Sequence, residues 1–136
     1  MVDKKIMVVE DEAPIRNVYE KGLTRAGFTV CTASSAEEAL VLIPKTSSMV
    51  FFLDLCIPGM DGVTLCKKIK QHWPMTIRIA VTGYASLYEL NDCREAGFED
   101  YFIKPVGIKD LVQVAHQAFA KIERWKSSGS KFSMAF

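Results

Sequence analysis

The sequence has no long hydrophobic run, and this absence argues against a membrane protein. No apolar stretch among the 136 residues approaches the roughly 18 consecutive residues that a transmembrane helix requires. Glu10, Asp11 and Glu12 interrupt the apolar residues near the N-terminus, so these residues do not form the hydrophobic core of a secretory signal peptide. We therefore expect a cytoplasmic protein that does not interact with membranes.

The sequence also lacks an excess of charge of one sign. It contains 17 Lys and Arg residues and 16 Asp and Glu residues, which gives a formal net charge of +1. Proteins that bind the phosphates of nucleic acids usually carry a clustered positive charge. We therefore do not expect this chain to bind nucleic acid directly.

Cysteine and histidine are too few, and too widely spaced, for a zinc site. The chain has only two histidines, and no two of its cysteines form a C-x-x-C pair. The four cysteines are Cys31, Cys56, Cys66 and Cys93. We expect them to be reduced and to have structural roles.

The sequence does contain a regular alternation of two apolar patterns. Hydrophobic residues make up 49% of the chain and charged residues 24%, as in a compact domain with its own core. Five short β-rich runs alternate with five stretches whose apolar residues recur at helical spacing. The predicted strands are residues 5–9, 28–32, 49–53, 77–81 and 101–103, and the predicted helices are residues 14–26, 35–43, 63–71, 87–96 and 108–125.

This alternation predicts an α/β fold, a doubly wound five-stranded parallel sheet of the (βα)5 type with helices on both faces. We expect one domain over residues 1–125. Pro44 should end the second helix, and the Ser-rich and Gly-containing residues 126–136 should form a flexible tail. The order of the strands in the sheet does not follow from this pattern.

The third predicted strand ends at a carboxylate. Residues 49–53 are continuously apolar, which is typical of a strand that helices cover on both faces, and Asp54 follows directly. The turn-forming residues Pro58, Gly59 and Gly62 come next. Open α/β sheets bind their ligands at the carboxyl ends of the strands, so Asp54 is a candidate for chemistry.

Polar residues end three other predicted strands. Glu10 and Asp11 follow the first, Thr82 the fourth and Lys104 the fifth, so these residues should meet Asp54 at one edge of the sheet. Carboxylates gathered without histidine or cysteine side chains favour a hard cation such as Mg²⁺. With Lys104 and Thr82, the group could support phosphoryl transfer to Asp54. A metal-binding or merely acidic patch is the alternative.

Four motifs carry a family resemblance. The sequences EDE, LDLCIPGMDG, VTG and FIKP end the first, third, fourth and fifth predicted strands, and they occur in this order between Lys4 and Trp125. The chain resembles the receiver domain of two-component response regulators, as in chemotaxis regulators. The resemblance implies a flavodoxin-like fold with strand order 2-1-3-4-5.

The resemblance also implies a phosphorylation site that uses Mg²⁺. Asp54 would accept a phosphoryl group from a phosphohistidine. Asp11 would bind Mg²⁺ directly and Glu10 through water, and the backbone carbonyl of Cys56 would be a further ligand. Many family members have Asp where this chain has Glu10.

The same resemblance assigns roles to residues of the last two strands. Lys104 would contact the phosphoryl oxygens and precede a cis peptide bond to Pro105. Thr82 would move to bond the phosphoryl group, and Tyr101 would turn inward behind it. Cys56 and Tyr84 occupy positions that vary in the family and set the rate of autodephosphorylation. We expect the Cys56 side chain to be buried and to take no part in chemistry.

Phosphorylation would shift the chain between two conformations and change the surface that a partner recognises. The expected partners are a sensor histidine kinase or phosphotransfer protein, and a downstream output protein or domain. The only catalysis expected is of the chain's own phosphorylation and dephosphorylation. We expect a monomer or weak dimer, either a stand-alone receiver or one excised from a longer protein.

Two other hypotheses fit part of the pattern. A phosphohydrolase of the haloacid-dehalogenase type also phosphorylates an aspartate at a strand end, but it requires a second aspartate where this chain has Cys56. A receiver-like interaction module that is never phosphorylated usually lacks an acid, the threonine or the lysine. This chain has all of them.

Overall fold

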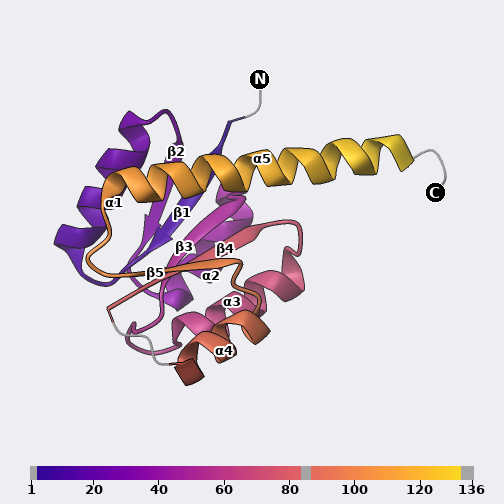
Figure 1. Ribbon diagram of the computed structural model, residues 1–136. Coiled ribbons are helices and arrows are strands. Elements are labelled where there is room, and N and C mark those ends of the chain that lie inside the picture. Colours follow the sequence, from indigo (N-terminus) through magenta and orange to yellow (C-terminus); the bar gives the residue numbers. More distant parts are fainter. Residues whose placement is uncertain (1–2, 84–86, 133–136) are drawn as a thin grey trace.

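The computed structural model describes residues 3–83 and 87–132, in which five strands alternate with five helices (Figure 1). The elements in chain order are β1 Lys5–Val9, α1 Ala13–Arg25, β2 Thr29–Ala33, α2 Ala36–Thr46, β3 Val50–Asp54, α3 Gly62–His72, β4 Ile77–Thr82, α4 Leu87–Ala96, β5 Asp100–Ile103 and α5 Ile108–Phe132.

All the strand pairs are parallel, and the strand order is β2-β1-β3-β4-β5. The fold class predicted from the sequence is therefore confirmed, and so is the strand order that the family resemblance implies. Within the sheet, β2 lies on one side of β1 and β3 lies on its other side, so the direction in which strands are added reverses after β2. This reversal places the carboxyl ends of β1 and β3 next to each other, where such sheets bind ligands.

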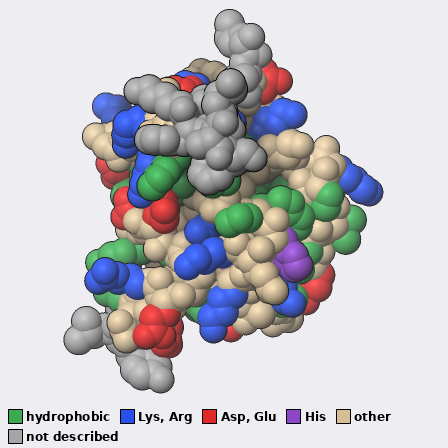
Figure 2. Space-filling model, turned by 90° about the vertical axis from the view of Figure 1, so that its right-hand side faces the viewer, with side chains coloured by type: hydrophobic (Ala, Val, Ile, Leu, Met, Phe, Trp, Pro, Cys, Tyr) green, Lys and Arg blue, Asp and Glu red, His purple; other side chains and the backbone are tan. Residues whose placement is uncertain are grey.

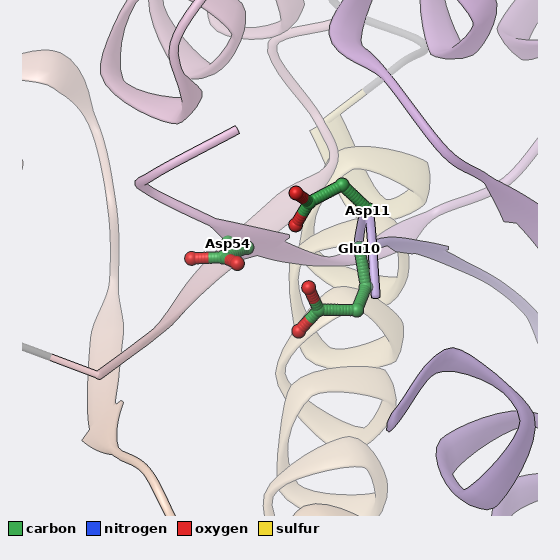
Figure 3. Close-up of side chains that lie close together, drawn as sticks. All are labelled: Glu10, Asp11 and Asp54. Atoms are coloured by element: carbon green, nitrogen blue, oxygen red, sulfur yellow. The ribbon is translucent and has the colours of Figure 1, made fainter. Parts of the chain in front are cut away.

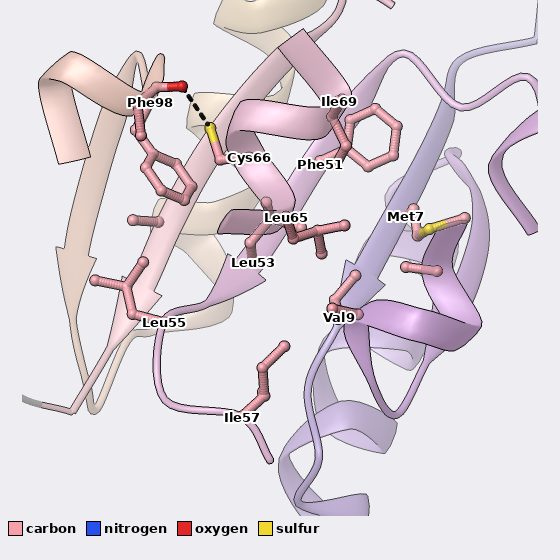
Figure 4. Packing of buried hydrophobic residues seen from close by; sticks show 14 of the residues in the cluster. Met7, Val9, Phe51, Leu53, Leu55, Ile57, Leu65, Cys66, Ile69 and Phe98 are labelled. Carbon is pink, nitrogen blue, oxygen red and sulfur yellow. Dashed lines mark hydrogen bonds between the residues drawn. The ribbon is translucent and has the colours of Figure 1, made fainter. Parts of the chain in front are cut away.

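Helices cover both faces of the sheet because alternate residues of its strands point to opposite sides. Ile6 and Val8 of β1 pack against α1 and α5, whereas Met7 and Val9 pack against the layer of α2, α3 and α4. Figure 4 shows part of the cluster that contains Met7 and Val9, in which Phe51 and other strand residues meet the inner sides of the helices. Burial on both faces accounts for the unbroken apolar runs in the sequence.

Local hydrogen bonds fix several helix ends close to where the sequence predicts them. The Ser35 side chain accepts a hydrogen bond from the Glu38 amide at the start of α2, and Asp61 does the same for Thr64 at the start of α3. Gly27, which follows α1, has a φ of 103°, a conformation that favours glycine.

Pro44 does not end α2 as predicted. The helix continues to Thr46 and ends at Ser47, which has a left-handed φ of 55°. Proline removes the hydrogen bond that its own nitrogen would donate, and its ring crowds the carbonyl four residues earlier. Pro44 lies in the last turn of α2, however, where the Ser47 amide still donates to the Ile43 carbonyl at 3.1 Å. One lost bond in the last turn is therefore tolerated.

The last helix does not end near residue 125 as predicted, because α5 continues to Phe132. Residues 126–132, which were predicted to belong to the tail, are therefore helical, and the flexibility of the tail stays a prediction. Figure 1 shows this part of the helix projecting beyond the sheet. Serine and glycine are poor helix formers, but extending an existing helix avoids the cost of nucleation. Residues 133–136 lie outside the described part of the chain.

The described residues include no helix that is both long enough and apolar enough to cross a membrane.

The four cysteines are free thiols, and burial raises the pKa of Cys66 to about 11. On the face shown in Figure 2, basic and acidic side chains are scattered rather than gathered in one patch of a single sign.

Candidate functional site

Three carboxylates meet at the carboxyl ends of β1 and β3. One carboxylate oxygen from each of Glu10, Asp11 and Asp54 lies within 4.8 Å of the other two. Figure 3 shows the three side chains, with Glu10 and Asp11 in the segment that follows β1 and Asp54 at the end of β3. The sequence predicted this group, because parallel strands bring their carboxyl ends to one edge.

The three carboxylates differ in their exposure to solvent. Glu10 is 2% exposed and Asp54 is 6% exposed, whereas Asp11 is an exposed residue. Buried carboxylates require a cation or hydrogen-bond donors close by. The site therefore combines two carboxylates shielded from water with a third at its mouth.

Lys104 supplies a cation to the two buried carboxylates. Its Nζ lies 2.5 Å from Glu10 Oε1 and 3.1 Å from Asp54 Oδ2. The Lys104 amide donates to the Thr82 carbonyl at 2.7 Å, which holds the end of β5 beside the end of β4. The predicted cis peptide bond between Lys104 and Pro105 is confirmed.

The electrostatics of the site centre on Glu10 and Lys104. Burial raises the pKa of Glu10 from 4.5 to about 7; the hydrogen bond from Lys104 opposes this rise, and the nearby charge of Asp54 adds to it. Burial alone would lower the pKa of Lys104, but its hydrogen bonds to Glu10 and Asp54 raise that pKa to about 12. Lys104 therefore stays charged over the whole physiological range.

Backbone contacts hold the acidic residues in place. The Cys56 amide donates to Asp54 Oδ1 at 3.1 Å, so each oxygen of Asp54 has a donor. Arg16 of α1 donates from Nη1 to the Glu10 carbonyl at 2.8 Å and to the Asp11 carbonyl at 3.4 Å. Arg16 could not be predicted from the sequence, because an arginine on a helix gives no signal that distinguishes a backbone contact from exposure to solvent.

A close approach of α3 to the end of β3 shapes the floor of the site. A Cβ atom on Gly62 would lie 2.3 Å from the Asp54 carbonyl oxygen and 2.8 Å from the Leu55 Cα. The Gly62 amide donates to the Leu55 carbonyl at 3.1 Å and closes the loop between β3 and α3. Glycine is therefore required at residue 62 for space and not for its φ.

The Cys56 side chain is exposed, so the prediction that it is buried is wrong. Leu55 and Ile57 are 8% and 6% exposed and belong to the core, so Cys56 between them points away from it. The backbone of Cys56 still contacts Asp54, as described above.

The two residues predicted to act as a switch lie in different surroundings. Thr82 is 1% exposed at the end of β4, at the same sheet edge as Asp54. Tyr101 of β5 is 44% exposed and borders a cavity of about 240 Å³ beside α4, together with Leu90 and Phe98. The inward movement of Tyr101 stays a prediction, and Tyr84 lies outside the described residues.

The donor atoms of the site fit a magnesium ion. The Glu10, Asp11 and Asp54 side chains offer only carboxylate oxygens, and neither histidine nor cysteine belongs to the group. Hard divalent cations such as Mg²⁺ prefer oxygen ligands of this kind.

Comparisons with known proteins agree with this geometry. The family model described as "Response regulator receiver domain" matches residues 6–116. The probable transcriptional regulator ycf27 of Porphyra purpurea is 36% identical over 108 residues, which are 79% of this chain and 44% of that protein. The DNA-binding transcriptional regulator NtrC of Salmonella typhimurium is 34% identical over 115 residues, which are 85% of this chain and 24% of that protein. The chain thus spans less than half the length of these two relatives.

Solved structures show the same fold. A CheY-like receiver domain protein from Methanospirillum hungatei JF-1 is 30% identical with a TM-score of 0.87, and the alignment covers 90% of this chain and 98% of that one. NtrX from Brucella abortus is 26% identical with a TM-score of 0.87, and the alignment covers 95% of this chain and 29% of that one.

Proposed function

Because the chain belongs to the family of response regulator receiver domains, we propose that it is a phospho-acceptor that receives a phosphoryl group on Asp54. One observation carries this proposal. The buried Asp54 carboxylate accepts hydrogen bonds from Lys104 and from the Cys56 amide, and it lies within 4.8 Å of two further carboxylates at the carboxyl edge of the sheet.

In the proposed reaction, a carboxylate oxygen of Asp54 attacks the phosphorus of a phosphohistidine. A new O–P bond forms as the N–P bond breaks. The electron pair of the N–P bond stays on the imidazole nitrogen of the donor. Lys104 is charged and close enough to stabilise the negative oxygens of the transferred group. The chain thus catalyses only its own phosphorylation and dephosphorylation.

Asp11, Asp54 and the backbone carbonyl of Cys56 would hold Mg²⁺, with Glu10 contributing through water. When bound, the ion would neutralise part of the charge that builds up on the phosphoryl oxygens. The Cys56 amide keeps one Asp54 oxygen oriented, and Arg16 holds the backbone of Glu10 and Asp11. Both contacts position the acidic groups without taking part in the reaction.

Phosphorylation would act on a partner by shifting the conformation of the chain. Thr82 would move toward the new phosphoryl group, and Tyr101 would turn inward from its exposed position. This would change the surface formed by α4, β5 and α5. The cavity beside Tyr101 provides space into which its ring could move.

The proposed donor is a sensor histidine kinase or a phosphotransfer protein, and we expect the exchange to occur in the cytoplasm. The proposed recipient of the signal is an output protein or domain. NtrC and ycf27 are named as transcriptional regulators, and this chain matches only part of each. We expect a monomer or a weak dimer, with no direct contact to nucleic acid.

Intact mass spectrometry after incubation with acetyl phosphate tests the proposal. We expect the native chain to gain the mass of one phosphoryl group in the presence of Mg²⁺ but not in the presence of EDTA. The Asp54→Asn variant should gain no phosphoryl group under either condition. If the native chain gains no phosphoryl group with Mg²⁺, the proposed function is wrong and a module that does not depend on phosphorylation is favoured.

A further inference from the structure

The loop between β3 and α3 carries the backbone of Cys56, yet its outer part makes few contacts. Ile57 anchors the loop in the core, and the Gly62 amide closes it at its base. On the side that faces α4, the loop borders a cavity of about 410 Å³ whose lining includes Cys56, Asp61 and Asp92. This cavity lies between the loop and Asp92 of α4.

Glu37, in the first turn of α2, reaches this loop. Its Oε2 accepts a hydrogen bond from the Met60 amide at 3.1 Å, across 23 positions of the sequence. A Cβ atom on Gly59 would lie 2.8 Å from the same oxygen, so the carboxylate packs directly against the loop backbone. Within the described chain, this is the only hydrogen bond that joins residues 57–60 to another element.

The position of this contact matters for metal binding. Residues 54–60 form one short segment, with the Asp54 carboxylate and the Cys56 backbone at one end and the Met60 amide at the other. A loop that is free to move at its outer end must be ordered when the ion binds, and that ordering weakens binding. A contact that orders the loop beforehand avoids this cost.

We propose that Glu37 is a positioning residue that orders the β3–α3 loop, through its hydrogen bond to Met60, for the binding of Mg²⁺ at the Asp54 site. This inference rests on the proposed function for its consequence, but not for the contact itself. Glu37 touches neither the three carboxylates nor Lys104 through any hydrogen bond or ion pair of the described residues. It acts through the loop backbone.

Its neighbour Glu38 provides a matched control. Glu38 also lies in the first turn of α2, but it accepts hydrogen bonds from the Ser34 amide and hydroxyl and has none to the loop. Glu37→Ala and Glu38→Ala each remove one carboxylate from the same helix turn. Glu37→Gln keeps an acceptor oxygen while it removes the charge.

The first measurement is the dissociation constant for Mg²⁺ alone, obtained by calorimetric titration. Glu37→Ala should raise this constant about three- to tenfold, whereas Glu38→Ala and Glu37→Gln should stay within about twofold of the native value. Equal constants for the two alanine variants would overturn the proposal. So would a Glu37→Gln variant as weak as Glu37→Ala, because the effect would then come from charge and not from the hydrogen bond.

The second measurement is hydrogen exchange of the Met60 amide in metal-free protein, followed by NMR. Glu37→Ala should speed this exchange about tenfold or more, and Glu38→Ala should leave it unchanged. Unchanged exchange in Glu37→Ala would also overturn the proposal. Because this readout needs neither Mg²⁺ nor phosphate, it separates the two hypotheses: a native chain that cannot be phosphorylated contradicts the proposed function, and unchanged Met60 exchange contradicts the role of Glu37.

Discussion

Glu10 is a carboxylic acid that is 2% exposed and lies beside a second buried carboxylate, Asp54. The pKa of Glu10 in the folded chain is about 7, against 4.5 for an ordinary glutamate. The folded state therefore binds a proton at Glu10 more tightly than the unfolded state does. As the pH rises from about 4.5 through 7, folding loses stability because the buried group becomes charged.

We predict that the metal-free chain loses stability relative to a Glu10→Gln variant between pH 5 and pH 8. The difference in the free energy of unfolding should grow in favour of the variant by about 2–3 kcal/mol over this range. Urea unfolding in EDTA at several pH values measures this difference. Lys104, whose pKa is about 12, keeps its charge throughout and does not contribute to the slope.

Added Mg²⁺ provides the control for this prediction. An ion held by the carboxylates favours their charged forms, so saturating Mg²⁺ should reduce the pH dependence of the native chain. A difference between the native chain and Glu10→Gln that stays constant from pH 5 to pH 8 in EDTA would contradict the raised pKa of Glu10.

Among the contacts between elements, the contact of α3 with the end of β3 leaves no room for a side chain at Gly62. Gly62→Ala would place a methyl group against the Asp54 carbonyl, where backbone atoms cannot move aside as a flexible side chain can. We predict a loss of about 2 kcal/mol or more in the free energy of unfolding. The variant should also show slower phosphorylation of Asp54, because the strand end that carries the carboxylate must shift.

Gly83→Ala is the matched substitution for stability, since a Cβ atom there would meet nothing within 4 Å. It should change the free energy of unfolding by less than about 1 kcal/mol. Chemical denaturation of both variants tests the comparison. Equal stability of the two variants would contradict the prediction that a side chain at residue 62 destabilises the fold.

Arg78 of β4 is a buried cation that joins this strand to the turn after α4. It is 4% exposed, and its Nε and Nη2 donate to the Gly97 carbonyl at 3.3 and 3.0 Å. Its Nη1 donates to the Thr76 carbonyl and hydroxyl. These contacts lie toward the amino ends of the strands, away from Asp54.

We predict that Arg78→Met lowers the free energy of unfolding by about 2–4 kcal/mol, because it leaves buried carbonyl groups without donors. Affinity for Mg²⁺ should stay unchanged, since the carboxylates lie at the other edge of the sheet. Denaturant unfolding together with a Mg²⁺ titration checks both expectations. A variant that loses Mg²⁺ affinity in step with stability would contradict the separation of the two edges.

The periodicity of the sequence was enough to predict the five strands and five helices, because burial on both faces leaves unbroken apolar runs and burial on one face leaves stripes. It could not predict how far α2 and α5 extend. Pro44 and Gly129 weaken a helix locally, and whether the helix continues depends on the balance of its other hydrogen bonds.

The candidate site was predictable for a different reason. Parallel strands carry their carboxyl ends to one edge, so Asp11, Asp54 and Lys104 could be grouped from the sequence alone. The supporting residues could not be found in this way. Arg16 and Glu37 lie in helices and bind backbone atoms, and no sequence pattern distinguishes such contacts from ordinary surface charge.

For the whole molecule, the proposed switch connects the Asp54 site to the surface of α4 and β5. We predict that beryllofluoride with Mg²⁺ changes the NMR spectrum at β5 and at Tyr101, which is 44% exposed in this structure. Thr82→Ala should still bind beryllofluoride at Asp54 but show much smaller changes at Tyr101. Equal changes in the native chain and in Thr82→Ala would exclude Thr82 from the switch.

The central claim is that Asp54 is the residue that carries the phosphoryl group. Borohydride reduction of the chain after reaction with acetyl phosphate and Mg²⁺ converts an acyl phosphate to an alcohol, which tandem mass spectrometry locates in the sequence. We predict that the reduced residue is Asp54 and that EDTA abolishes the signal. Reduction at another residue, or none in the native chain, would contradict the account.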